Sequence, residues 1–144
     1  MALLDVNVLV ALFDPDHIHH EAAHRWFGRE RRHGWATSAM TENGLIRGLS
    51  NPSYSTNAER PAEVAARLAH MREGKEHTFW TEAISLCDEA AFDLRLLSGH
   101  GQLTDAFLLG LSVAHRGRLA TFDRTIPLGS VCGALPEHLV LIPA

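Results

Sequence analysis

The sequence has few cysteines and no long apolar run. Cys87 and Cys132 are its two cysteines, and they lack the CxxC spacing of a metal or redox motif. We therefore expect a reducing compartment and two buried, unreactive thiols. No stretch is apolar enough to cross a membrane, and the first apolar run carries Asp5 and lacks the basic start of a secretory leader. These absences predict a cytoplasmic protein that does not bind a membrane.

The chain also lacks the excess positive charge of a protein with a broad nucleic-acid-binding face. Its formal net charge is -4, from 17 acidic and 13 basic residues. Only Lys75 is a lysine, and the other basic residues are arginines, which suit bidentate contacts with phosphate. Charge alone therefore neither requires nor excludes a nucleic-acid substrate.

No internal repeat, linker or low-complexity tract divides the chain. Its 144 residues, 46% of them hydrophobic, are enough for one core and too few for two. We therefore expect a single domain over residues 1–144. The sequence has no glycine-rich phosphate loop and no spacing typical of a Ser, His and Asp triad, so neither chemistry is favoured.

Segments typical of strands and helices alternate along the chain. Apolar strands are predicted at the N-terminus, before a turn at residues 5–7, and then at 35–38, 77–80, 119–122 and 138–142. Helices are predicted after the first turn and at 19–31, from 38 or 41 to 49, 61–72 and 102–115. Residues 85–97 are ambiguous and fit one or two short helices. This alternation predicts a three-layer α/β sandwich around a parallel sheet.

Four acidic residues are predicted to meet at one edge of this sheet. Asp5 ends the first strand, and Glu42 lies at the start of the helix after the second strand. The helix from Asp105 climbs roughly 16 Å, and the strand to Asp123 returns roughly 20 Å, so these two also reach that edge. The carboxyl edge of an open α/β sheet is where ligands bind.

A cluster of carboxylates predicts a metal site. Like charges raise one another's pKa unless a cation neutralises them, and we expect no basic residue among the four acids. Oxygen ligands favour Mg²⁺ or Mn²⁺, which activate water for phosphodiester hydrolysis. Asn7 and Thr121, each two residues from an aspartate, can orient the carboxylates. Each acid alone also fits a helix cap or a turn, but the shared edge favours the metal site.

Three segments contain the four acids: LLDVNVLVAL at 3–12, TENGLIRGLSNP at 41–52 and LTDAFLLGLSVAHRGRLATFD at 103–123. Together they resemble the PIN-domain ribonucleases, and in particular the VapC toxins of type II toxin–antitoxin systems. The resemblance covers essentially the whole chain and implies an α/β/α sandwich with a five-stranded parallel sheet in the order 3-2-1-4-5. It also implies catalytic, metal-binding roles for Asp5, Glu42, Asp105 and Asp123, supported by Asn7, Thr104 and Thr121. Many relatives carry further acids where this chain has Thr81 and Ala83.

The same resemblance implies an activity and partners. It implies an endoribonuclease dependent on Mg²⁺ or Mn²⁺ that cleaves structured RNA, either transfer RNA or the sarcin–ricin loop of 23S ribosomal RNA, and so inhibits translation. It further implies a homodimer and a VapB antitoxin whose C-terminal segment enters the site. Arg47 and Arg124 are candidates to bind RNA phosphates, and a surface role fits each equally well.

Other interpretations remain open. A PIN nuclease that processes RNA would carry the same residues, and an antitoxin-like reading frame upstream would distinguish a toxin from it. A phosphatase of the haloacid dehalogenase type would need a second aspartate in place of Asn7. A non-catalytic binding module would not need all four acids. His20 and His24, with His17 nearby, have a spacing that can hold zinc, although packing and capping around Trp26 are favoured.

Overall fold

Five short parallel strands form the middle layer of the structure, a computed structural model that describes residues 1–144. Their order is β3-β2-β1-β4-β5, so the predicted 3-2-1-4-5 order is confirmed. The strands are β1 (Ala2–Leu4), β2 (Trp35–Ser38), β3 (His77–Trp80), β4 (Arg118–Thr121) and β5 (Leu139–Leu141). The first strand is central, which is why it is buried on both faces.

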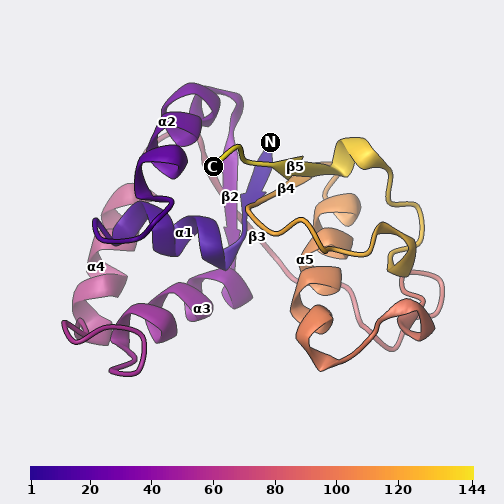
Figure 1. The fold of residues 1–144 in the computed structure, drawn as a ribbon. Helices are drawn as coiled ribbons and strands as arrows, with labels where there is room; N and C mark the ends of the chain where they lie inside the picture. Colours follow the sequence, from indigo (N-terminus) through magenta and orange to yellow (C-terminus); the bar gives the residue numbers. More distant parts are fainter.

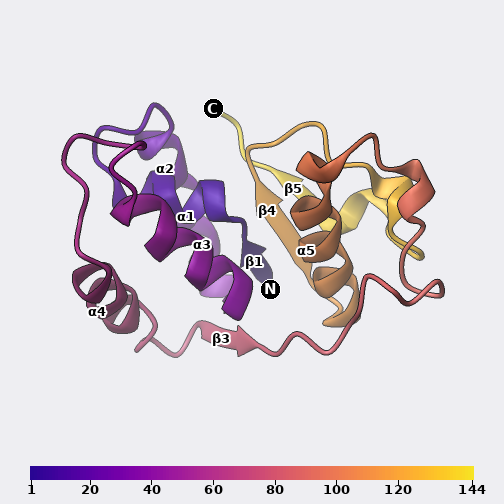
Figure 2. The same ribbon diagram turned by 90° about the horizontal axis from the view of Figure 1, so that it is seen from below.

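Helices cover both faces of the sheet (Figure 1). One face carries α1 (Val6–Phe13), α2 (His20–Glu30), α3 (Ala39–Ser50) and α4 (Pro61–Met71), and the other carries α5 (Leu103–Ala114). Figure 2 shows the strands between the two helical layers. Short 3₁₀ turns complete the chain at Arg31–His33, Leu94–Leu96, His100–Gln102, Leu128–Ser130 and Pro136–His138. None of the helices is both long and apolar enough to span a bilayer.

The alternation of side chains along the strands divides the core into two clusters. Leu4 and Trp35 pack with helices α1 to α4, whereas Leu3 and Leu119 pack with α5. Trp35 is 1% exposed, and the ring of Phe27 meets its ring edge-on at 5.3 Å between centroids. Burial of each such side chain contributes about 1.5–3 kcal/mol, so the two clusters hold the sheet rigidly between its helical layers.

The connection after β1 is tighter than the predicted turn at residues 5–7. Helix α1 begins directly at Val6, and the Asp5 carboxylate caps it by accepting the Val6 N–H at 2.7 Å. A carboxylate at this position satisfies a backbone donor that the helix leaves unpaired. The turn is absent because one capping side chain is enough to start the helix.

Helix α3 comes close to the beginning of α1. Ser38 caps α3 by accepting the Thr41 N–H at 3.4 Å, and the Thr41 hydroxyl accepts the Ser38 N–H at 2.9 Å. At Gly44, an added Cβ would lie 2.6 Å from Cγ2 of Val6, so only glycine permits this approach. The first turns of both helices are thereby held together at the carboxyl edge of the sheet.

Two expectations for the C-terminal half are wrong. Residues 85–97 form turns and the single 3₁₀ turn Leu94–Leu96 in place of the short helices. Phe92 of this segment forms an isolated bridge with Val131 and packs against α5 at Gly110. Cys87 and Cys132 lie on these irregular segments and are exposed, not buried, because no helix covers the loops that carry them.

Candidate active site

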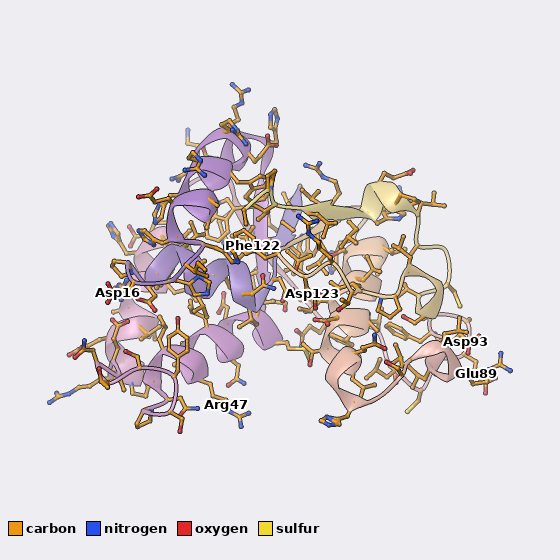
Figure 3. All side chains as sticks on the ribbon, viewed as in Figure 1. Asp16, Arg47, Glu89, Asp93, Phe122 and Asp123 are labelled. Carbon is orange, nitrogen blue, oxygen red and sulfur yellow. The ribbon has the colours of Figure 1, made fainter.

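Three aspartates from distant parts of the chain meet at the carboxyl edge of β1 and β4. Parallel pairing sets Leu4 of β1 beside Ala120 of β4, so Asp5 leaves the sheet next to Thr121. Asp105 lies in the first turn of α5, and Asp123 follows β4 by two residues. Figure 3 shows Asp123 between the layer of α1 to α4 and helix α5.

The Thr121 hydroxyl organises this edge. It donates to Oδ2 of Asp5 at 2.7 Å, and it accepts the Asp123 N–H at 3.0 Å. It also accepts a hydrogen bond from Nδ2 of Asn7 at 3.1 Å, while Oδ1 of Asn7 accepts the Phe122 N–H at 3.3 Å. Thr121 therefore contacts both Asp5 and Asp123, and Asn7 holds Thr121 in place.

The three carboxylates perturb one another's protonation. Burial, followed by the negative charges of Asp5 and Asp123 and a hydrogen bond with Asp123, raises the pKa of Asp105 to about 7. Burial also raises the pKa of Asp5, against the hydrogen bonds from Thr121 and Val6. The hydroxyl and N–H of Thr125 lower the pKa of Asp123. Protonation of Asp105 would therefore reduce the repulsion among the three carboxylates.

These residues fit a hard divalent cation by their chemistry. Their carboxylate oxygens are the ligand type preferred by Mg²⁺ and Mn²⁺, and the pKa of Asp105 is raised first by burial and then by the negative charges of Asp5 and Asp123, which a cation would balance. No three His, Cys, Asp or Glu side chains form a complete ligand set around one point. Mg²⁺ needs only one or two carboxylates, because it keeps several waters and takes further oxygens from substrate phosphates.

Glu42 does not join the aspartates, contrary to the expected meeting of four acids. Its carboxylate accepts the Thr37 hydroxyl at 2.6 Å and Nη1 of Arg72 at 3.0 Å. The expectation of no basic residue among the acids is therefore wrong for Glu42. Its side chain turns toward β3 and the end of α4, because Arg72 and Thr37 lie on that side.

The remaining candidates lie at the periphery. Thr104 is exposed in the first turn of α5 and makes no hydrogen bond through its hydroxyl. Arg47, in the last turn of α3, and Arg124, beside Asp123, are exposed and form no ion pair. Figure 3 shows Arg47 on the outer side of α3, apart from Asp123.

The histidines near α2 serve packing, and the zinc alternative finds no support. His20 hydrogen-bonds the carbonyl of Ala11 at 2.7 Å, and His24 hydrogen-bonds that of Leu12 at 2.9 Å. These carbonyls belong to the end of α1, where helical acceptors lack partners. One ring nitrogen of each histidine is thus hydrogen-bonded to α1, and the two rings connect α2 to α1.

Two residues that the sequence did not single out, Thr37 and Arg72, are the partners of Glu42. Thr37 carried a detectable signal, because it is a polar residue within a strand that is buried at every position. Arg72 carried none, because an arginine at the end of a helix forms no distinctive pattern, and only the fold places it beside Glu42.

Comparison with known proteins assigns this arrangement to a family. The PIN domain family profile matches residues 2–128. The chain is 43% identical over 143 residues to ribonuclease VapC44 of Mycobacterium tuberculosis, covering 98% of this chain and 99% of that protein. It is 44% identical over 125 residues to ribonuclease VapC39 of the same organism, covering 87% and 90%. The chain belongs to the VapC ribonucleases of the PIN-domain family.

Solved structures of VapC proteins share the fold at low sequence identity. VapC20 of M. tuberculosis, described as a toxin that cleaves the sarcin–ricin loop, superposes with a TM-score of 0.61 at 14% identity, covering 88% of this chain and 92% of that one. VapBC2 of Rickettsia felis, bound to a DNA fragment from its promoter, gives a TM-score of 0.60 at 14% identity, covering 97% and 96%. The three-layer architecture is therefore that of VapC proteins.

Proposed function

We propose that this VapC ribonuclease is a toxin that cuts structured RNA internally, with Mg²⁺ or Mn²⁺ held by its aspartates. The observation that carries the proposal is the convergence of Asp5, Asp105 and Asp123, with the pKa of Asp105 raised to about 7. Such a cluster has a deficit of positive charge that a divalent cation would balance. A haloacid dehalogenase phosphatase is disfavoured, because Asn7 is occupied in orienting Thr121.

In this proposal each residue has a specific task. Asp5 and Asp105 would hold the cation, with Asp123 beside them, and a bound cation would balance charge and activate water for phosphodiester hydrolysis. Thr121 keeps Oδ2 of Asp5 in a fixed direction through its 2.7 Å hydrogen bond. Asn7 fixes the Thr121 hydroxyl from the other side. Glu42 is the fourth candidate ligand and would have to leave Arg72 to reach the site.

The proposed substrate is a folded RNA of the translation machinery, either transfer RNA or the sarcin–ricin loop of 23S ribosomal RNA. The description of VapC20 as a sarcin–ricin toxin supports this class. A chain with a net charge of -4 offers few phosphate contacts along an extended strand, which favours selection by RNA shape. In a homodimer, Arg47 and Arg124 of both copies would add positive charge beside the paired sites.

A VapB antitoxin is the proposed partner, supported by the VapBC2 complex among the structural neighbours. An apolar groove of about 480 Å³ lies between α1 and α4, lined by Leu12, Phe13, Ala66, Arg67, His70 and Met71. A groove of this kind fits the apolar face of an amphipathic helix. A basic residue beyond that helix would then pair with the acidic cluster.

Removal of metal tests the proposed activity. Purified protein should cleave a transfer RNA or a sarcin–ricin stem-loop with Mg²⁺, lose the activity in EDTA and regain it with excess Mn²⁺. Asp5→Asn, which keeps the shape of the side chain and removes its charge, should abolish cleavage without a change in the circular dichroism spectrum. Full cleavage in EDTA, or an active Asp5→Asn variant, would overturn the proposal.

A further inference from the structure

Glu42 is held by Arg72 and Thr37, and His77 of β3 in turn holds Thr37. Nη1 of Arg72 lies 3.1 Å from Oε1 and 3.0 Å from Oε2, and the Thr37 hydroxyl donates to Oε2 at 2.6 Å. Since that hydroxyl has a single proton, it must accept its second hydrogen bond, at 2.8 Å, from Nε2 of His77. The carboxylate is therefore held by a chain of oriented donors.

Arg72 is itself held in place. It caps the C-terminus of α4, and its guanidinium lies over the ring of Phe79 of β3, 5.2 Å from the centroid. The Arg72 side chain is 35% exposed and that of Glu42 is 17% exposed. Because both side chains are partly buried, solvent screens this ion pair less than a surface ion pair. Arg72 can therefore compete with a cation for the Glu42 carboxylate.

The backbone that carries Glu42 nevertheless lies beside the aspartates. Pairing of Leu3 with Ala36 brings Asp5 and Ser38 to the same sheet edge on neighbouring strands, which lie about 4.8 Å apart. Glu42 follows Ser38 by one helical turn, and Gly44 contacts Val6, the residue after Asp5. To turn toward Asp5, the Glu42 carboxylate would have to break its contacts with Arg72 and Thr37.

We propose that Arg72 is a positioning residue that competes with the divalent cation for Glu42, so that Glu42 exchanges the guanidinium for the metal when the site is loaded. This inference rests on the proposed metal dependence of the ribonuclease. In the metal-free protein, Arg72 keeps a fourth negative charge away from the three aspartates. In the loaded protein, Glu42 adds an oxygen ligand, and the cost of separating it from Arg72 weakens metal binding.

A purely structural ion pair between α3 and α4 would behave differently. It would contribute to the stability of the fold, and its loss would leave the affinity for metal unchanged. If Arg72 competes with the metal, the ion pair affects metal affinity. Glu42 must give up its contacts with Arg72 before it can bind the metal, and the free energy of those contacts is subtracted from the free energy of metal binding. Metal affinity measured without RNA therefore separates the two roles.

The experiment is a titration of the free protein with Mn²⁺, followed by electron paramagnetic resonance of the unbound ion. Arg72→Gln should lower the Kd for Mn²⁺ by about fivefold, as expected from the loss of one partly buried ion pair. Arg72→Lys, which keeps the charge, should remain close to wild type. Arg67→Gln is the matched control, because it removes an equal charge from α4 at a residue that pairs with Glu59 instead.

A second comparison, made in the Glu42→Gln variant, shows whether Arg72 acts through Glu42. In Glu42→Gln protein, the further change Arg72→Gln should leave the Kd unaltered, since no carboxylate remains to be released. An unchanged or weaker affinity in the single Arg72→Gln variant, with its thermal unfolding intact, would overturn the competing role. Absence of Mn²⁺ binding by the wild-type protein would instead overturn the proposed metal dependence, and this inference with it.

Discussion

Single side chains set the geometry of the site more than the backbone does. Thr121 uses its one proton on Asp5 and both its acceptor positions on Asn7 and Asp123. Its position two residues before Asp123 made it a candidate from the sequence to orient that aspartate. Glu42 was equally recognisable as an acid at the sheet edge. The direction of its side chain was not, since that direction depends on Arg72, 30 residues further along the chain.

The histidine in the same network gives a prediction for stability against pH. Burial, and secondarily the charge of Arg72, lowers the pKa of His77 from 6.5 to about 4. Between these values the unfolded chain binds a proton that the folded chain does not, so the free energy of unfolding falls as pH drops from 6.5 toward 4. Above pH 6.5 this group contributes no pH dependence.

Urea unfolding at pH 7 and pH 5 measures the contribution of His77. The variant His77→Gln keeps a donor for Thr37 but cannot titrate, so it should lose less stability between the two pH values than wild type. His100→Gln is a control, because His100 is exposed in a 3₁₀ turn and makes no hydrogen bond through its ring. Equal losses for His77→Gln and wild type would show that His77 titrates normally in the folded protein.

At the scale of elements, the close contact of α1 and α3 determines where the acidic residues lie. A Cβ at Gly44 would lie 2.6 Å from Val6, whereas a Cβ at Gly48, one turn later, would lie 3.7 Å from Val10. Gly44→Ala should therefore cost about 1–3 kcal/mol of stability, the usual range for overpacking, and should reduce RNA cleavage. Chemical denaturation and an RNA cleavage assay check the two effects.

Gly48→Ala is the matched substitution for this test. It adds the same methyl group to the same helix at an ordinary contact distance, and alanine favours helix by about 1 kcal/mol over glycine. Gly48→Ala should be neutral or stabilising, with unchanged activity. If the two variants behave alike, the approach of α3 to α1 does not control the site.

The bounds of two strands could be predicted from the sequence. Strands β2 and β3 begin and end at the predicted residues, because short apolar or β-branched runs are bounded by turn residues and helix caps. Helix α5 was recognisable from its long apolar face. The turns at residues 85–97 could not be recognised from the sequence. Their apolar side chains pack against α5 from irregular backbone, so they follow no helical or strand period. Cys87 lies in this irregular segment, so its exposure could not be predicted from the sequence either.

At the scale of the whole molecule, the groove between α1 and α4 is the predicted contact for the antitoxin. Ala66 lines the groove and is exposed, whereas Ala69, on the same helix and also exposed, lies outside it. Ala66→Asp would place an unpaired carboxylate against the apolar face of the partner, so it should weaken the toxin–antitoxin complex roughly tenfold or more. Ala69→Asp should have little effect, and isothermal titration calorimetry compares the two.

If Ala66→Asp binds the antitoxin as tightly as Ala69→Asp, the antitoxin docks elsewhere on the toxin. Ribonuclease activity of the free Ala66→Asp protein should equal that of wild type, since α4 contributes none of the aspartates. Inhibition assays with the antitoxin would then show whether loss of the groove contact also releases the active site.

In the proposed site, a divalent cation binds where three distant segments of the chain meet. Fe²⁺ can replace Mg²⁺ in such a site, and with ascorbate and peroxide it cleaves the backbone close to where it is bound. Mass spectrometry of the fragments should show cuts clustered near Asp5, Asp105 and Asp123, suppressed by excess Mg²⁺ and absent in Asp105→Asn. Cuts clustered instead around His17, His20 and His24, or cuts that persist unchanged in Asp105→Asn, would contradict the claim.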